Sequence, residues 1–231
     1  MWRGHANIEW SLRAEVFRPL PGGKSYPEVS LIRTFMGQAE SRYARCPPST
    51  DLLGWLILAR HYGLPTRILD WSMSPLVALF FAVEKMEIEN DGALWALDPG
   101  VLNWDMVRSN RWMLPDDFWV QKIVAQAYEP EREPAEKALE ELAGKAVAVG
   151  TREIDPRVMV QQGAFTIHAD GRDLADPTRV AEGQRFLFGI RVVGKAKPEL
   201  LGELTNLGIL RSSLFPDLHS LALDLKQRWA P

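Results

Sequence analysis

The 231-residue chain has almost no cysteine, little net charge and no long apolar run. Its one cysteine, Cys46, excludes an internal disulfide and a thiolate metal cluster, which suits a reducing compartment. No run reaches the roughly 18 apolar residues that a membrane span needs, and the first residues lack the pattern of a signal peptide. We therefore expect a cytoplasmic protein without a membrane partner.

The charges are nearly balanced, with 27 Lys and Arg against 30 Asp and Glu and a net charge of −3. This balance excludes the overall basic field that drives non-specific binding to nucleic acids. The sequence also lacks a GxxxxGK[ST] loop, a strand-linked GxGxxG, a GxSxG elbow, HExxH and CxxC. These absences argue against a P-loop nucleotidase, a Rossmann dehydrogenase, a serine hydrolase of the elbow type and a metal site.

The apolar pattern mixes helical and strand periods, which predicts an α+β fold: one domain with a mixed or antiparallel β core flanked by helices. Helical spacing from Leu52 to Ala59 is followed by a turn and a short strand at Ile68, and Ser74-Pro75 is a start signal for a helix to Val83. Further predicted strands are 93–97, 146–149, 158–160, 164–167 and 186–193, and the closing helices are about 198–207 and 217–228. A helical surface insertion is expected at approximately 116–145, where 129–145 is strongly polar.

Polar side chains gather in the segment ARHYGLPTRILDWSMSPLVALFFA, residues 59–82, at the junctions of its apolar elements. Such side chains tend to face a cleft, and the candidate site residues here are His61, Tyr62, Arg67, Asp70, Trp71, Ser72 and Ser74. A structural interpretation competes with this one. Arg67 and Asp70 flank the short strand and could form an internal ion pair that pins it to the next helix.

The same segment, from HYGLPTRILDW onwards, resembles the central signature of FRG-domain proteins, and Trp2-Arg3-Gly4 resembles the aromatic-Arg-Gly motif of that family. The resemblance continues in RVMVQQGAF at 157–165 and in the closing segments near Leu207 and Leu214, so it covers nearly the whole chain. It implies one FRG domain over residues 1–231.

A more distant resemblance to ADP-ribosyltransferases implies that NAD is the substrate and that the fold is ADP-ribosyltransferase-like. Arg3 and Gly4 would then bind the phosphates, with Ser72 and Ser74 as the Ser-x-Ser at a strand end. Gln161 or Gln162 would stand where a glutamate is expected. The remaining cofactor-binding candidates are Arg67, as a further guanidinium, and Tyr62 and Trp71, as stacking surfaces.

Glutamine cannot supply the negative charge that stabilises a positively charged ribosyl transition state. Asp70 or Glu153 could supply it, Gln161 could instead position a ribose hydroxyl, or the pocket could only bind a nucleotide. His61 is the candidate proton shuttle, because the unperturbed pKa of histidine lies near neutrality. The catalytic candidates are thus His61, Asp70 and Gln161.

Three functions remain open at this point. The first is an enzyme that transfers ADP-ribose from NAD to DNA, RNA or protein, as a toxin or phage-defence effector would. The second is a non-catalytic nucleotide-binding sensor module. The third is a nuclease that uses His61 and Asp70, which the missing acidic metal cluster disfavours.

Overall fold

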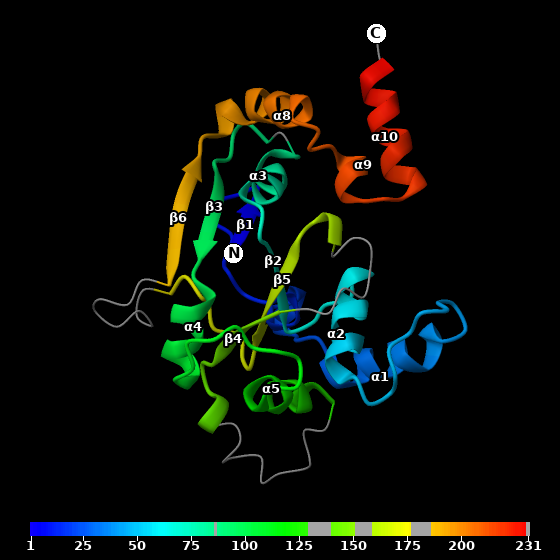
Figure 1. Cartoon of the computed structure of the whole chain (residues 1–231), viewed down its shortest axis with the longest axis vertical. Helices are drawn as coiled ribbons and strands as arrows, with labels where there is room; N and C mark the ends of the chain where they lie inside the picture. Colours follow the sequence, from blue (N-terminus) through cyan, green and yellow to red (C-terminus); the bar gives the residue numbers. More distant parts are fainter. Residues whose placement is uncertain (86, 129–139, 151–158, 177–185, 230–231) are drawn as a thin grey trace.

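The computed structural model describes residues 1–85, 87–128, 140–150, 159–176 and 186–229. One six-stranded sheet in the order β4-β5-β2-β1-β3-β6 forms its centre, and neighbouring strands are antiparallel (Figure 1). The strands are β1 Trp2–His5, β2 Ile68–Ser72, β3 Gly92–Leu97, β4 Ala146–Val149, β5 Gly163–His168 and β6 Leu187–Val192. The predicted α+β class with an antiparallel core is therefore confirmed.

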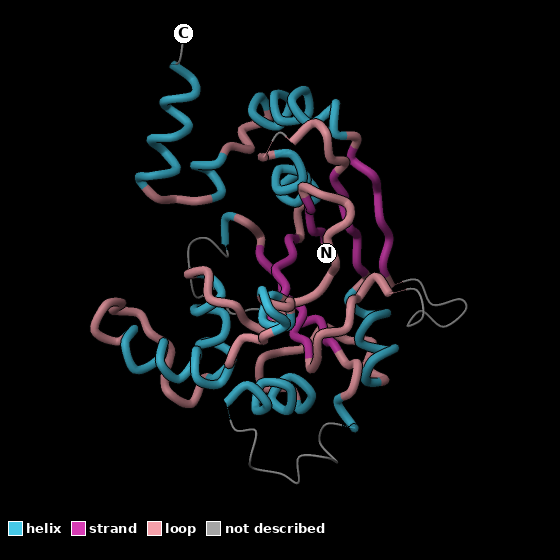
Figure 2. Tube along the Cα trace, turned by 180° about the vertical axis from the view of Figure 1, so that it is seen from behind, coloured by secondary structure: helices cyan, strands magenta, loops and turns pink. Residues whose placement is uncertain are grey.

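Helices surround this sheet, as the trace in Figure 2 shows. They are α1 Glu28–Ala39, α2 Leu52–His61, α3 Pro75–Val83, α4 Pro99–Val107, α5 Phe118–Tyr128, α8 Lys197–Asn206, α9 Arg211–Leu214 and α10 Leu218–Trp229. Short 3-10 turns lie at η1 Glu15–Phe17, η2 Pro21–Gly23 and η4 Gly194–Ala196. None of the described helices is both long enough and apolar enough to cross a membrane.

The sheet consists of two halves that are joined weakly. The halves β4-β5-β2 and β1-β3-β6 meet where β1 pairs with β2, and the only register pair there is Trp2 with Ser72 among the described residues. By contrast, β1 pairs with β3 over four residues and β2 with β5 over five. The two central strands therefore diverge after one pair and leave backbone groups between them free to bind side chains.

Separate cores hold the two halves. The helices α1, α2 and α5 pack with Ile68, Val147 and Ile167 of the first half, whereas α3 and α8 pack with Leu94 and Val192 of the second. A third cluster, which includes Leu12, Leu69, Trp71 and Leu102, fills the opposite face of the sheet.

The predicted start signal of α3 is confirmed. The Ser74 side chain accepts a hydrogen bond from the Val77 amide, and Pro75 occupies the first turn. The neighbouring Gly4 lets this helix lie close to β1, because a Cβ atom at Gly4 would be 1.9 Å from the Ala78 carbonyl oxygen. The glycine of the Trp-Arg-Gly motif thus has a packing role.

Two expectations about local structure need correction or qualification. The strand predicted at 158–160 is wrong, because Met159 and Val160 are helical and lead into the turn before β5; residue 158 lies outside the described residues. Within the expected surface insertion at 116–145, residues 129–139 also lie outside them. However, α5 belongs to the main core, since its Val120, Ile123 and Val124 are fully buried. The buried face of this helix contacts α1 and α2.

Candidate functional site

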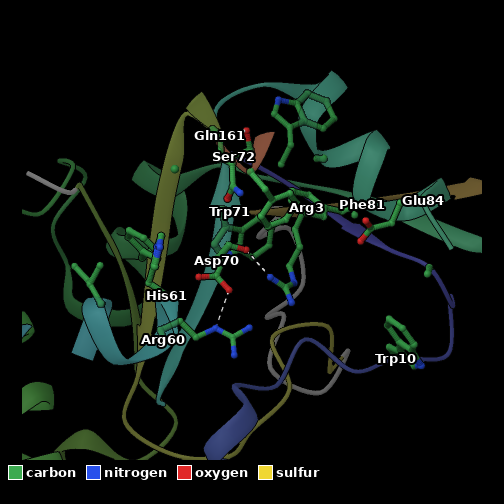
Figure 3. A pocket seen from close by; sticks show the side chains of 18 of the residues that line it. Arg3, Trp10, Arg60, His61, Asp70, Trp71, Ser72, Phe81, Glu84 and Gln161 are labelled. Carbon is green, nitrogen blue, oxygen red and sulfur yellow. Dashed lines mark hydrogen bonds and ion pairs between the residues drawn. The ribbon is translucent and has the colours of Figure 1, made fainter. Parts of the chain in front are cut away.

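A cavity of about 330 Å³ lies where β1 and β2 diverge. Its walls come from β1, β2, the end of α2, α3 and the approach to β5 (Figure 3). The lining residues are Trp2, Arg3, Gly4, Ala6, Trp10, Ile57, Arg60, His61, Asp70, Trp71, Ser72, Ala78, Phe81, Glu84, Lys85, Gln161, Gly163, Phe165 and Phe215. Residues that are far apart in the sequence therefore meet at the weak seam of the sheet.

Arg3 forms the centre of the cavity wall. Its Nη1 donates to the Asp70 carbonyl oxygen at 2.6 Å and its Nε donates to Nε2 of His5 at 3.0 Å. Burial lowers the pKa of Arg3 to about 10, with Asp70 acting in the opposite direction, so the guanidinium remains charged at neutral pH. The divergence of β1 from β2 explains this position, because it leaves the Asp70 carbonyl available to a side chain.

His5 is buried next to Arg3 and accepts a hydrogen bond from it as a neutral imidazole. Burial, assisted by the Arg3 cation, lowers the pKa of His5 to about 3. The neutral imidazole can then accept a hydrogen bond from the Arg3 guanidinium without bringing a second positive charge into the site. This contact fixes the guanidinium plane.

Asp70 lies beside Arg3 and belongs to a chain of ion pairs. Nε of Arg60 donates to Oδ2 of Asp70 at 2.9 Å, and Nη1 of Arg60 binds the Glu15 carboxylate. Burial acts against the Arg60 cation, but the carboxylates of Asp70 and Glu15 raise its pKa above the ordinary value. Figure 3 shows Arg60 and Arg3 reaching Asp70 from different elements. Sequence reasoning missed Arg60, although it adjoins the predicted His61.

Arg67 does not line the cavity, and its predicted pairing with Asp70 is wrong. It is buried with Glu28, whose carboxylate accepts from Nη2 of Arg67 at 2.6 Å and from Nε at 3.1 Å, while Nη1 donates to the Ile123 carbonyl. Side chains alternate along a strand, so residues three positions apart point to opposite faces. Arg67 therefore joins β2 to α1 and α5.

The predicted Ser-x-Ser pair divides between two roles. Ser72 lines the cavity, where its Oγ donates to the Gln161 carbonyl oxygen at 2.7 Å and accepts from the Ser74 amide at 3.0 Å. Ser74 caps α3 and is not part of the lining. Only Ser72 is thus placed to contact a ligand in this cavity.

Gln161 also lines the cavity, two residues before β5 begins. Its Nε2 donates to the Leu214 carbonyl of α9 at 3.0 Å. Gln162, the other candidate, has φ of 48°, and its carbonyl accepts from the Met73 amide, so it shapes the turn. Glu153 lies outside the described residues.

The aromatic wall differs from the one predicted. Trp71 touches the cavity but is almost entirely buried, with its Nε1 donating to Oγ1 of Thr166, and Tyr62 is 58% exposed and not part of the lining. Trp10 is the most exposed indole among the lining residues, and the Lys85 ammonium lies 5.1 Å from the centroid of its ring. Phe81 and Phe215 complete the wall as an edge-to-face pair.

Glu84 is a second carboxylate of the cavity that sequence reasoning missed. It caps the end of α3 and accepts from Nη1 of Arg211 at 2.8 Å. Burial raises its pKa despite the nearby Arg211 and Lys85. The only sequence signal was its place one residue after an apolar helix, which does not distinguish it from a surface residue.

Two further predicted residues, His61 and Gly4, are also placed at the cavity. His61 and Gly4 line the cavity, Gly4 through its backbone. His61 sits at the end of α2 with its ring 5.1 Å from that of Tyr62. No group of three or more His, Cys, Asp or Glu side chains in the described part of the chain is arranged to hold a metal ion.

Comparisons with known proteins give one match. No curated protein and no solved structure matches the chain. The model of the FRG domain family matches residues 1–91, a region that holds β1, α2, β2 and α3 and with them most of the cavity lining. The FRG-domain prediction made from the sequence is therefore confirmed for residues 1–91.

Proposed function

We propose that this chain cleaves NAD and transfers ADP-ribose to a macromolecular acceptor. The proposal rests mainly on the meeting of Arg3, Ser72 and Gln161 at one cavity from three distant parts of the chain. These are the positions at which the resemblance to ADP-ribosyltransferases implies a phosphate ligand, a hydroxyl at a strand end and the residue in place of the usual glutamate.

The electrostatics of the cavity suit a pyrophosphate next to a ribose. Arg3 stays charged, is held by His5 and can offer its remaining N–H groups to two phosphate oxygens. Trp10 offers an accessible aromatic face for a base, and a cavity of about 330 Å³ lies within the range of about 300–1,000 Å³ typical of small-molecule sites.

In this proposal Asp70 supplies the negative charge that Gln161 lacks. The carboxylate lies on the cavity wall and Arg60 fixes its orientation, so it can stabilise positive charge that develops on the ribose. Gln161 then orients a ribose hydroxyl, and His61 passes the proton of the acceptor to solvent.

Such an activity fits a toxin or a phage-defence effector that acts in the cytoplasm on DNA, RNA or protein. The single cysteine, Cys46, is compatible with the reducing conditions there.

The test is release of nicotinamide from NAD by the purified chain, alone and with DNA, RNA or cell lysate, followed by chromatography. The wild type should release nicotinamide, and label from the adenylate part should appear on one acceptor class. Gln161→Ala should slow release by at least about tenfold, because an oriented hydroxyl contact is lost. Gln38→Ala, an exposed glutamine on α1, is the matched control and should behave as the wild type.

A nucleotide-binding sensor is the second candidate function. It is favoured by the pairing of both cavity carboxylates with arginines, Asp70 with Arg60 and Glu84 with Arg211, together with the amide at Gln161. Calorimetric binding of NAD without any release of nicotinamide would select this function. Absence of both binding and release would reject the two candidates together.

A further inference from the structure

The closing helix α10 has its polar and apolar sides reversed relative to the body of the protein. Figures 1 and 2 show it extending away from the sheet, next to α9. The side toward α9 carries Ser220, which is buried, and Asp224, whose carboxylate accepts from the Ser212 amide. The opposite side is apolar, and its Leu218 is 83% exposed and its Trp229 is 80% exposed.

The outward side is a continuous stripe. With about 100° per residue, four residues lie nearly opposite the Ser220 side of the helix: Leu218, Ala222, Leu225 and Trp229. Their spacing of four, three and four residues is that of the core positions of a coiled coil. We call these four residues the α10 stripe. The three large members of the stripe, Leu218, Leu225 and Trp229, are exposed, and exposed apolar surface of this kind is typical of an interface.

We propose that the α10 stripe packs against the α10 stripe of a second copy of this chain, antiparallel about a two-fold axis. The stripe is self-complementary in that arrangement, because Leu218 lies opposite Trp229 of the partner copy and Ala222 lies opposite Leu225. A two-fold interface requires such reciprocal contacts.

The flanking charges select the antiparallel direction. One border of the stripe carries Asp217 at the start of the helix and Arg228 at its end. Antiparallel pairing brings Asp217 of each copy next to Arg228 of the other, whereas parallel pairing would leave these two residues at opposite ends of the interface and without this contact. The helix dipoles also oppose one another favourably in the antiparallel arrangement.

Helix α9 would lie between this interface and the cavity. α10 follows α9, and α9 contacts two cavity residues, since Arg211 binds Glu84 and the Leu214 carbonyl accepts from Gln161. Dimerisation would therefore brace one wall of the cavity, but the interface itself does not depend on which ligand the cavity takes.

Sedimentation velocity from about 1 to 100 µM tests the interface. The wild type should show a monomer–dimer equilibrium, and Leu225→Glu should weaken it by at least about tenfold, because a charge would replace a central apolar contact. Leu207→Glu changes a leucine that is 65% exposed after α8 and should leave the equilibrium unchanged. Circular dichroism of both variants checks that the helices are retained. A monomer at every concentration, or a dimer that survives Leu225→Glu, would overturn the proposal.

Single-cysteine cross-linking tests the direction of pairing, in a background with Cys46→Ser. Ala222→Cys lies near the two-fold axis and should form a disulfide-linked dimer under mild oxidation. Leu218→Cys should not, because antiparallel pairing separates the two copies of this residue by roughly 16 Å along the axis at 1.5 Å per residue. Efficient linkage through Leu218→Cys would indicate parallel pairing and refute the antiparallel arrangement.

Discussion

Strand β2 separates two groups of charges that have similar composition and different surroundings. Before the strand, Arg67 and Glu28 form a buried pair whose donors are also bound to the Ile123 carbonyl and the Gln126 side chain. Within the strand, the Asp70 side chain is partly exposed at the cavity. Its carboxylate binds Arg60 and its backbone carbonyl binds Arg3, so Asp70 connects the two arginines. The buried pair Arg67–Glu28, called the closed pair below, has no room for a ligand. The group Arg3, Asp70 and Arg60, called the open group below, lines the cavity and does have room for one. Arg67 and Asp70 thus lie three residues apart in one segment, yet only Asp70 faces a cavity with room for a ligand.

The largest expected effect comes from breaking the closed pair. Arg67→Met leaves the Glu28 carboxylate buried without its partner, which should cost about 3–5 kcal/mol in the free energy of unfolding. Urea denaturation followed by tryptophan fluorescence measures the loss. The double variant Arg67→Met with Glu28→Leu removes both charges and should recover much of it; no recovery would show that the pair does not act as a unit.

Substitutions in the open group should lower the activity and should change the free energy of unfolding much less. Asp70→Asn keeps the shape of the side chain and removes its charge, so nicotinamide release should fall by about 10²–10³-fold if the carboxylate stabilises the transition state. The same variant should lose no more than about 1 kcal/mol of stability, since a partly exposed ion pair contributes little. Loss of stability with unchanged release would make Asp70 a structural residue like Arg67.

The close packing of α3 against β1, beside the cavity, depends on Gly4. Gly4→Ala would place a methyl group against the Ala78 carbonyl and should cost about 1–3 kcal/mol, because helix α3 must move away from β1. Gly37→Ala, where no atom lies within 4 Å of the added methyl, is the matched control. It should be neutral or should stabilise α1 by up to about 1 kcal/mol. Equal effects of the two substitutions would contradict the close approach.

The smallest expected effect is on the pH dependence of stability, through His5, which binds Arg3. The pKa of His5 is about 3 in the folded chain, below its ordinary value of 6.5, so unfolding takes up a proton between these values. The stability that His5 contributes should be complete above about pH 6.5 and should fall as the pH drops toward about 3. His5→Gln retains an acceptor for Arg3 and should flatten this part of the profile in denaturant titrations at pH 7, 5.5 and 4. An unchanged slope would show that other groups cause the acid dependence.

Local signals predicted much of this fold. Helical spacing, Gly63 and Pro65 predicted α2, the turn and β2 in the right order, and Ser74-Pro75 predicted the start of α3. These signals depend on residues within a few positions of one another. The core position of α5 was not predicted, because its partners on α1 and α2 lie more than 50 residues earlier in the chain.

The site was predicted only in part, for the same reason. Arg3, His61, Asp70, Ser72 and Gln161 do line one cavity. The alternation along β2 already excluded an Arg67–Asp70 pair, and this signal was available in the sequence. The contributions of Trp10, Arg60 and Glu84 depend on how β1, α2 and α3 meet, which local patterns do not specify.

Isothermal titration of NAD into the wild type, Arg3→Lys and Arg172→Lys tests most directly whether the open group is the functional site. Arg3→Lys keeps a positive charge but loses the planar fork that can hold two phosphate oxygens, so its affinity should fall by at least about tenfold. Arg172 is exposed, pairs with Asp170 and lies outside the cavity lining, so its substitution should leave the affinity unchanged. Binding that is equal in all three proteins, or absent from the wild type, would contradict the assignment of this cavity to NAD.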